Sequence, residues 1–364
     1  MVFIAGLLLA YANGANDNFK GVATLFGSGT ARYRGSLVWA TVTTLAGSAV
    51  ALVLANGLLA AFSGKGLVPP GVIASPAFPA SVGLAAGGTV LLATRLGFPI
   101  STTHALIGGL VGAGLVAAGD LLNLGSLTDK FLVPLLVSPL LAMVLAMTLY
   151  PFVRRARRRL GVTHETCICV GQDVVATLPG NPGAAAALQS VSLTLDESAN
   201  CKVRYQGAVM GISVGRLLDG LHYLSAGAVC FARGLNDTPK IAALLLAGGT
   251  IDADMALIAV GVLMAVGGLI SARRVAEKMS HDIAEINPGQ GLTANLITSS
   301  LVIFASKLGV PVSTTHVSCS ALFGIGASTH RAHWGVIGQI ALAWLITLPT
   351  GALLGAGAMA VLGR

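Results

Sequence analysis

Two stretches of this sequence, "ATRLGFPISTTH" (93–104) and "ASKLGVPVSTTH" (305–316), repeat one another 212 residues apart. Leu, Gly, Pro and the run Ser-Thr-Thr-His recur at matching positions, and Arg95 is matched by Lys307. Nearer the start, "GANDNFKGVA" (14–23) aligns with "GLNDTPKIAA" (234–243) at a spacing of 220 residues. The chain therefore consists of two related halves.

The composition places both halves in a membrane. Of the 364 residues, 54% are hydrophobic, 10% are charged and 47 are Gly. A soluble domain carries about 25% charged residues, and Gly-rich apolar helices are typical of close packing in lipid. We therefore expect a polytopic membrane protein whose partner is the lipid bilayer, with no role in binding nucleic acid.

The apolar segments are long enough to cross a bilayer, which requires about 20 residues per helix. They cover about 2–28, 36–61, 78–97, 100–118, 131–153, 207–248, 255–272, 291–308, 311–328 and 335–362. These segments predict an all-α fold with a first transmembrane repeat (1–153), a central loop (154–206) and a second transmembrane repeat (207–364). Inside the loop, "VSLTLDES" is typical of a strand. After the loop, 207–221 is typical of an amphipathic interfacial helix.

Positive charge predicts the orientation, because cytoplasmic loops are rich in Lys and Arg. If the central loop faces the cytoplasm, 14 of the 22 Lys and Arg residues lie on that side and three on the other. This holds only if 78–118 and 291–328 are re-entrant hairpins with tips at Pro99 and Pro311. We therefore expect a protein of the cytoplasmic (inner) membrane. Its N-terminus lies on the outer side of that membrane, and its central loop lies in the cytoplasm.

With that orientation the two halves have opposite topology. Inverted repeats with broken helices are the architecture of secondary transporters, whose binding site lies near the bilayer midplane. We expect each repeat to contain a broken first helix and a re-entrant helical hairpin.

Asp17 and Asp237 are the only acidic residues inside the predicted spans once the interfacial stretch 207–221 is left out. A charge at the bilayer centre costs about 2.5–3.5 kcal/mol on insertion scales, so its repetition favours a functional role. Asn16, Asp17, Asn236 and Asp237 supply oxygen ligands for a coupling ion, either Na⁺ or H⁺; no other metal site is predicted. The alternative is a structural ion pair in each half, of Asp17 with Lys20 and of Asp237 with Lys240, at i,i+3 spacing.

The hairpin tips predict an anion site. A proline ends one half-helix, and Ser101 or Ser313 caps the next. The first turn then presents free N–H groups, a partial positive charge and threonine hydroxyls to an anion. The residues predicted to contact substrate are Ser101, Thr102, Thr103, Ser313, Thr314 and Thr315. We expect His104 and His316 to lock the hairpins, with donation to the anion and proton relay as the alternatives. Arg95 and Lys307 either snorkel toward the membrane surface or attract anions, without direct contact.

At these residues the chain resembles the inorganic phosphate transporter (PiT, PHO-4) family. The Gly-x-Asn-Asp pair and the duplicated Pro-[Ile/Val]-Ser-Thr-Thr-His hairpins carry the resemblance over essentially the whole chain. It implies symport of inorganic phosphate with Na⁺ or H⁺ by alternating access. It also implies that the Asn-Asp pairs serve the coupling ion and substrate, and that the Ser-Thr-Thr runs hold phosphate.

The chain departs from the family pattern directly after the Asn-Asp pair, where it reads "NDNFKG" (16–21) and "NDTPKI" (236–241). The family pattern continues Asn-Asp-x-Ala-Asn-Ala, but Lys20 and Lys240 replace the second Asn. A fixed ammonium either substitutes for a bound cation or adds an anion ligand, so both lysines join the predicted substrate contacts. This replacement favours H⁺ over Na⁺ as the coupling ion.

Three classes of function compete on this sequence. We expect a secondary active phosphate transporter, with no cofactor beyond its coupling ion; a sulfate permease of the same fold and a passive anion channel are the alternatives. Phosphate leads because HPO₄²⁻ offers a hydrogen-bond donor to an ionised aspartate, whereas sulfate only accepts. A membrane-embedded enzyme is disfavoured, since neither His104 nor His316 has an acidic partner near it in sequence. A homodimer is left open as an alternative to a monomer.

Overall fold

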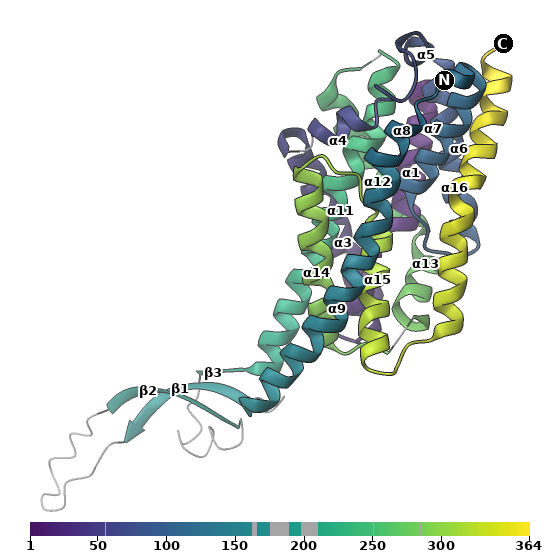
Figure 1. Cartoon of the computed structure of the whole chain (residues 1–364). Coiled ribbons are helices and arrows are strands. Elements are labelled where there is room, and N and C mark those ends of the chain that lie inside the picture. The colour runs from purple at the N-terminus through teal and green to yellow at the C-terminus, as the bar shows by residue number, and fades with distance from the viewer. Residues whose placement is uncertain (55, 162–165, 175–188, 198–209, 250, 284) are drawn as a thin grey trace, which may run out of the picture. The chain divides into compact units, whose positions relative to one another are not determined.

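The computed structural model describes the chain except residues 55, 162–165, 175–188, 198–209, 250 and 284 (Figure 1). It forms two compact units: Met1–Tyr150 together with His222–Arg364, and Pro151–Leu221. The described part of the first unit is built from helices and their links, with no β-strand. This confirms the expected all-α membrane architecture.

The helices of the first half precede the central segment. They are α1 (Val2–Asp17), α2 (Ala23–Gly27), α3 (Tyr33–Leu54), α4 (Asn56–Ala61), α5 (Pro70–Ala74), α6 (Ala77–Arg95), α7 (Thr102–Ala118), α8 (Leu124–Leu127) and α9 (Val133–Arg159). The second half contains α11 (Val214–Ala247), α12 (Ala253–Ser271), α13 (Arg273–Glu277), α14 (Pro288–Lys307), α15 (Thr314–Ser328) and α16 (Trp334–Leu362). The two halves thus share one order of elements. A first helix (α1–α2 or α11) is followed by a span (α3 or α12), a helical hairpin (α6–α7 or α14–α15) and a last long helix (α9 or α16).

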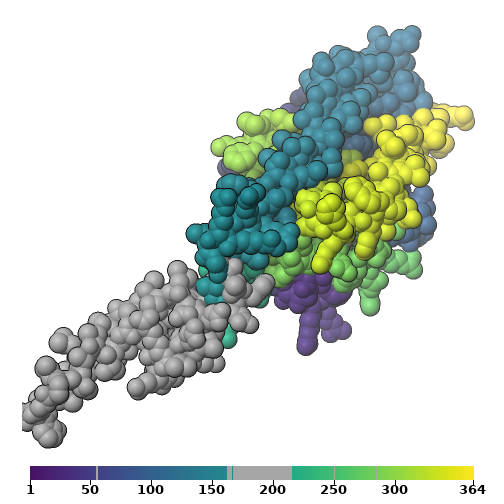
Figure 2. Space-filling view, turned by 60° about the horizontal axis from the view of Figure 1, so that its bottom comes forward, coloured from purple at the N-terminus to yellow at the C-terminus, as the bar shows by residue number. Residues whose placement is uncertain are grey.

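Six of the described helical stretches are long and apolar enough to cross a membrane. They are Tyr33–Leu54, Ala77–Arg95, Thr102–Leu121, Leu124–Arg159, Ala253–Ser271 and Trp334–Leu362. Large apolar side chains lie exposed along α9 and α16, among them Leu136, Leu140, Leu345 and Leu353. Figure 2 shows both helices, in teal and in yellow, on one face of the first unit. Such a continuous exposed apolar surface suits lipid rather than water.

The first helix of the first half is broken, as expected. α1 ends at Asp17, and α2 begins only at Ala23, with turns at Asn18–Val22 between them. The second half differs: α11 is one continuous helix with Pro239 inside it, so the break expected there is absent. Proline removes only one helical N–H, and helices in membranes tolerate this where neighbouring groups satisfy the freed carbonyl.

Both predicted hairpins are present as α6–α7 and α14–α15, and each pair is joined by an extended link that contains the repeated proline. α7 packs along α16, and α1 packs against α6 and α12 (Figure 1). Glycines allow the close approach: a Cβ on Gly112 of α7 would overlap the carbonyl oxygen of Ala352 in α16. Small residues at helix contacts are the usual solution in lipid.

The second unit contains the strands. β1 (Thr166–Val174) is the middle strand of an antiparallel sheet in the order β2-β1-β3, with β2 at Gln189–Glu197 and β3 at Met210–Ser213. β2 includes the predicted strand "VSLTLDE". Of the interfacial helix expected at 207–221, residues 207–209 lie outside the described residues and 214–221 are helical as the start of α11. The expectation is wrong for 210–213, whose backbone pairs with β1.

Candidate functional site

Each hairpin tip ends in the predicted serine cap. The Ser101 hydroxyl accepts a hydrogen bond from the backbone N–H of His104 at 3.1 Å and starts α7. Ser313 does the same for His316 at 3.2 Å and starts α15. Both serines are buried. Because their hydroxyls cap the first turn, they set where the two helices begin.

The two tips meet through crossed hydrogen bonds. The Thr315 hydroxyl of the second hairpin donates to the carbonyl oxygen of Ile100 in the first, at 2.9 Å. The Thr103 hydroxyl of the first hairpin donates to the carbonyl oxygen of Val312 in the second, at 3.4 Å. Tips more than 200 residues apart in sequence therefore form one buried cluster.

Lys20 reaches into this junction from the link between α1 and α2. Its ammonium contacts the Asp17 carboxylate, and it donates to the carbonyl oxygen of Ile100 and the hydroxyl of Thr315, each at 2.6 Å. The Lys20 side chain has no exposed surface. The Asp17–Lys20 ion pair, the alternative that the i,i+3 spacing offered, is present, but it is one part of a shell to which both halves contribute.

Lys240 repeats the arrangement from α11. Its ammonium donates to the Thr103 hydroxyl at 2.9 Å and the carbonyl oxygen of Val312 at 2.7 Å, and lies 3.5 Å from the Asp237 carboxylate. Each lysine thus contacts one carboxylate, one backbone carbonyl and one threonine hydroxyl. This is the type of all-oxygen shell that hard cations bind in proteins.

The two asparagines hold the hairpin that belongs to their own half. The Asn16 amide donates to the hydroxyl of Thr94 and the carbonyl oxygen of Phe98, both at 3.0 Å, and its oxygen accepts from the N–H of Ile100. Together these bonds fix the first hairpin link on α1.

Asn236 makes the corresponding contacts in the second half. Its amide donates to the carbonyl oxygen of Val312 and the hydroxyl of Thr314, each at 3.2 Å. Its oxygen lies 3.3 Å from the hydroxyl of Ser306, the counterpart of Thr94. Most of the side-chain polar atoms of both asparagines are thereby engaged with protein groups.

Asn13 joins the two carboxylates, and sequence reasoning missed it. Its amide nitrogen lies 3.1 Å from the Asp17 carboxylate and 3.2 Å from the Asp237 carboxylate. It also lies 3.0 Å from the hydroxyl of Thr102, which donates to Asp17 at 3.1 Å. The available signal was the i,i+4 spacing of Asn13 and Asp17, which places both on one helix face.

Arg233 occupies the position in the second half that corresponds to Asn13. It is fully buried, and one guanidinium nitrogen lies 3.4 Å from the side-chain oxygen of Asn18. Within the described part of the chain, its Nε and Nη1 atoms have no hydrogen-bond partner. The buried set of Asp17, Lys20, Arg233, Asp237 and Lys240 carries one surplus positive charge when all five are ionised.

The two histidines lie against one another behind the tips. Their ring centroids are 4.3 Å apart, and the ring of His316 lies 3.9 Å from that of Trp344 in α16. His104 Nδ1 lies 3.0 Å from the Ser101 hydroxyl, and the Trp344 indole donates to the carbonyl oxygen of Pro99. These contacts fit the expected role of locking the hairpins.

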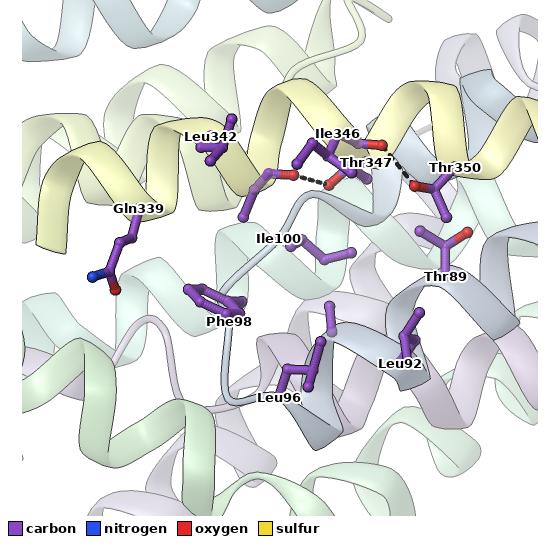
Figure 3. A pocket seen from close by; sticks show the side chains of 12 residues that line it. Thr89, Leu92, Leu96, Phe98, Ile100, Gln339, Leu342, Ile346, Thr347 and Thr350 are labelled. Carbon is purple, nitrogen blue, oxygen red and sulfur yellow. Dashed lines mark hydrogen bonds between the residues drawn. The ribbon is translucent and has the colours of Figure 1, made fainter.

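The back of the first hairpin is apolar. A groove of about 290 Å³ runs between its link and α16. Figure 3 shows Phe98 and Ile100 of the link opposite Leu342 and Ile346 of α16. The same link therefore presents the carbonyl oxygen of Ile100 to Lys20 and the side chains of Phe98 and Ile100 to an apolar surface.

The other two basic residues of the repeated motif lie outside the cluster. Arg95 and Lys307 are exposed in the last turns of α6 and α14. The described residues contain no group of three or more His, Cys, Asp or Glu side chains that could hold a metal ion. The polar site thus consists of the two hairpin tips, the two Asn-Asp pairs and the two lysines, with Asn13 between the carboxylates.

Known proteins resemble this chain over nearly its full length. The model of the phosphate transporter family matches residues 13–355. The chain is 28% identical to "Inorganic phosphate transporter 2-1, chloroplastic" of Arabidopsis thaliana, covering 96% of this chain and 69% of the relative. It is 26% identical to a "Probable low-affinity inorganic phosphate transporter" of Rhizobium meliloti, covering 96% and 92%. A solved structure titled "The sodium-dependent phosphate transporter" has the same fold, with a TM-score of 0.77 at 21% identity, covering 100% of this chain and 98% of the other.

Proposed function

Because the chain belongs to the phosphate transporter family, a family of transporters and not of enzymes, we propose that it carries inorganic phosphate by ion-coupled alternating access. The observation that carries this proposal is the convergence of both hairpin tips on the two buried aspartates. Duplicated half-helices that meet at one polar site are the arrangement by which transporters of inverted-repeat architecture bind substrate.

The charge of the buried cluster supports an anionic substrate. Lys20 and Lys240 each lie beside a carboxylate, and the fully buried Arg233 adds a third positive charge, so that the buried charged residues have one surplus positive charge when all are ionised. An uncompensated buried charge is costly, and an anion of opposite sign relieves that cost. In this proposal the threonine hydroxyls and the helix starts behind them hold the phosphate oxygens, and Lys20 and Lys240 supply the positive charge.

We propose H⁺ rather than Na⁺ as the coupling ion. In each half, the oxygen shell that a Na⁺ ion would need is taken by a lysine ammonium of the chain itself. The solved structure that shares the fold is titled as sodium-dependent, so this chain would differ in coupling. Asp17 and Asp237, each beside its lysine, are the groups through which a proton would be gained and lost.

Phosphate over sulfate follows from the same carboxylates. At neutral pH, phosphate keeps an O–H that can donate to an ionised aspartate, whereas sulfate offers only acceptors that a carboxylate repels. Sites that leave buried polar groups unpaired with the wrong substrate discriminate strongly.

For the orientation we propose an N-terminus outside and a cytoplasmic central segment, in the cytoplasmic membrane. The segment 154–206 contains seven Lys and Arg residues, and an excess of such residues is typical of cytoplasmic loops. The two halves then have opposite topology, and exchange between inward-facing and outward-facing states is the movement such repeats support.

The proposal is tested with purified protein in liposomes. Labelled phosphate uptake is measured under an imposed H⁺ gradient, an imposed Na⁺ gradient and neither, with sulfate as competitor. We expect saturable accumulation above equilibrium with the H⁺ gradient alone, and little inhibition by a tenfold excess of sulfate. Uptake that only equilibrates would indicate a passive channel, and accumulation that needs Na⁺ would refute the proposed coupling.

A further inference from the structure

A second polar feature lies beside the buried cluster and is separate from it. It is a cavity of about 700 Å³ between the last turn of α6, α1, α13 and the end of α12. Arg95, Arg273 and Arg274 line it, together with the single acidic residue Glu277. We call this cavity the arginine vestibule.

The arginine vestibule carries a net positive charge. With three guanidinium groups and one carboxylate, the lining has a charge of +2 when all are ionised. Glu277 lies 3.0 Å from Arg273 and offsets part of the charge of that residue, whereas Arg274 donates to the carbonyl oxygen of Arg95 at 2.7 Å. A recess lined by charges of one sign concentrates ions of the opposite sign.

The inner wall of the vestibule reaches the buried cluster. Tyr11 and Ser271 line it, with their hydroxyl oxygens 2.8 Å apart, and so does Thr94. The Thr94 hydroxyl accepts the hydrogen bond from Asn16, the residue before Asp17. One threonine therefore lies between the vestibule and the cluster to which both hairpins contribute.

The corresponding turn in the other half is more tightly packed. Gly309, at the turn after α14, lies against Gly57 of α4 so closely that a Cβ on Gly57 would be 2.9 Å from the Cα of Gly309. Its counterpart Gly97, after α6, is less crowded: a Cβ there would be 3.7 Å from the nearest atom, the carbonyl oxygen of Arg274. The turn after α6, two residues beyond Arg95 of the vestibule, is thus less tightly packed than the turn after α14.

From this geometry we propose that the arginine vestibule is a second binding site for a phosphate-class oxyanion. It holds the anion at one membrane face before the anion passes Thr94 into the buried cluster. This deepens the proposed transport function and rests on it. The vestibule would raise the local concentration of free phosphate on that face, so it would act on the apparent affinity rather than on the maximal rate.

Two charge variants with opposite expected effects test the vestibule. Arg95→Gln removes one positive charge, and Glu277→Gln frees Arg273 from its partner. Each has a matched control: Lys307→Gln changes the equivalent last-turn position of α14, and Glu285→Gln breaks the exposed pair with Arg331 at 3.2 Å. All four changed residues are exposed, so the variants are expected to fold.

The readout is the initial rate of labelled phosphate transport by the full chain in right-side-out and inside-out membrane vesicles, at low and high ionic strength. At low ionic strength we expect Arg95→Gln to raise KM about three- to tenfold and Glu277→Gln to lower it, with the maximal rate within about twofold of wild type. We expect both effects at one membrane face only, smaller at high salt, and absent from the two controls.

Further outcomes separate the alternatives. A wild-type protein without saturable phosphate transport would refute the proposed function itself. Saturable transport with the same KM in all variants, or the same KM change at both faces, would leave that function standing and overturn the vestibule. A phospholipid headgroup offers the same phosphate chemistry, so the assay is repeated in liposomes with and without phosphatidylglycerol. A KM effect seen only with this anionic lipid would assign the arginines to lipid and overturn the proposal.

Discussion

The ammonium of Lys20 lies 2.6 Å from the hydroxyl of Thr315, a residue 295 positions further along the chain. Lys240 reaches the opposite way and lies 2.9 Å from the hydroxyl of Thr103. Each half therefore contributes a lysine to the hairpin of the other. The buried cluster is one site with two related ligand shells, and the predictions below test how far the two shells act together.

The two aspartates are expected to be needed for uphill transport. Asp17→Asn and Asp237→Asn each remove a carboxylate that faces a lysine and accepts from Asn13. We expect gradient-driven phosphate accumulation in liposomes to fall at least about tenfold in each variant, because removing the carboxylate leaves the charge of its lysine buried without a partner. Asp120→Asn, an exposed carboxylate, is the matched control. Undiminished accumulation in both variants would remove the aspartates from coupling.

Replacing the lysines is expected to change the coupling ion. In Lys20→Asn combined with Lys240→Asn, the carboxylate, carbonyl and hydroxyl oxygens of both shells lose their ammonium. We expect Na⁺ to bind there, so that uptake becomes stimulated by a Na⁺ gradient and the purified variant is thermally stabilised by Na⁺, because a ligand that binds only the folded state stabilises it.

The matched control for this change is Lys307→Asn, an exposed lysine outside both shells. It should show neither effect of Na⁺. A double lysine variant that folds but responds to Na⁺ no more than this control would contradict the idea that the ammonium groups stand in for a bound cation.

The crossed threonines should be equally important in the two halves. Thr103→Ala removes a hydroxyl that accepts from Lys240 and donates to the carbonyl oxygen of Val312, and Thr315→Ala does the same for Lys20 and Ile100. Hydrogen bonds to charged groups contribute about 1.5–3 kcal/mol, so we expect phosphate affinity to weaken about tenfold or more in each. Serine at either position should restore most of it. Equilibrium binding of labelled phosphate gives the answer, and wild-type affinity in both alanine variants would show that the hydroxyls are dispensable.

Packing between α7 and α16 offers a stability test that does not involve the site. In Gly112→Ala the new methyl group would overlap the carbonyl oxygen of Ala352, and overpacking typically costs about 1–3 kcal/mol. Gly357→Ala in α16 is the control, since a Cβ there meets nothing within 4 Å. We expect a lower melting temperature for the first variant in detergent and an unchanged or raised one for the second. Equal melting temperatures would mean that the helices can separate freely at this contact.

Much of the architecture could be predicted because it depends on local sequence patterns. The repeated prolines and serines predicted both hairpins, and the structure starts α7 and α15 directly after Ser101 and Ser313. Helix capping depends on residues within one turn, which a sequence displays directly. The polar turns after Asp17 likewise fit the break expected in the first half.

Other features depend on tertiary contacts that a single sequence does not display. The lysine spacing predicted ion pairs within each half, whereas the contacts of each lysine with the opposite hairpin depend on how the halves are docked. Asn13 was overlooked because its counterpart is Arg233, so it lies outside the repeated pattern. The continuity of α11 through Pro239 was also hidden, since it depends on neighbouring groups in the folded bundle.

Because each lysine binds a threonine of the opposite half, the contacts have a genetic consequence. A codon change at Thr103 alters a hydrogen-bond partner of Lys240, and one at Thr315 alters a partner of Lys20. The duplicated segments therefore cannot diverge independently of one another. A nonsense mutation between codons 21 and 315 leaves Lys20 encoded but removes its ligand Thr315. Alleles truncated within this range should therefore not support phosphate uptake.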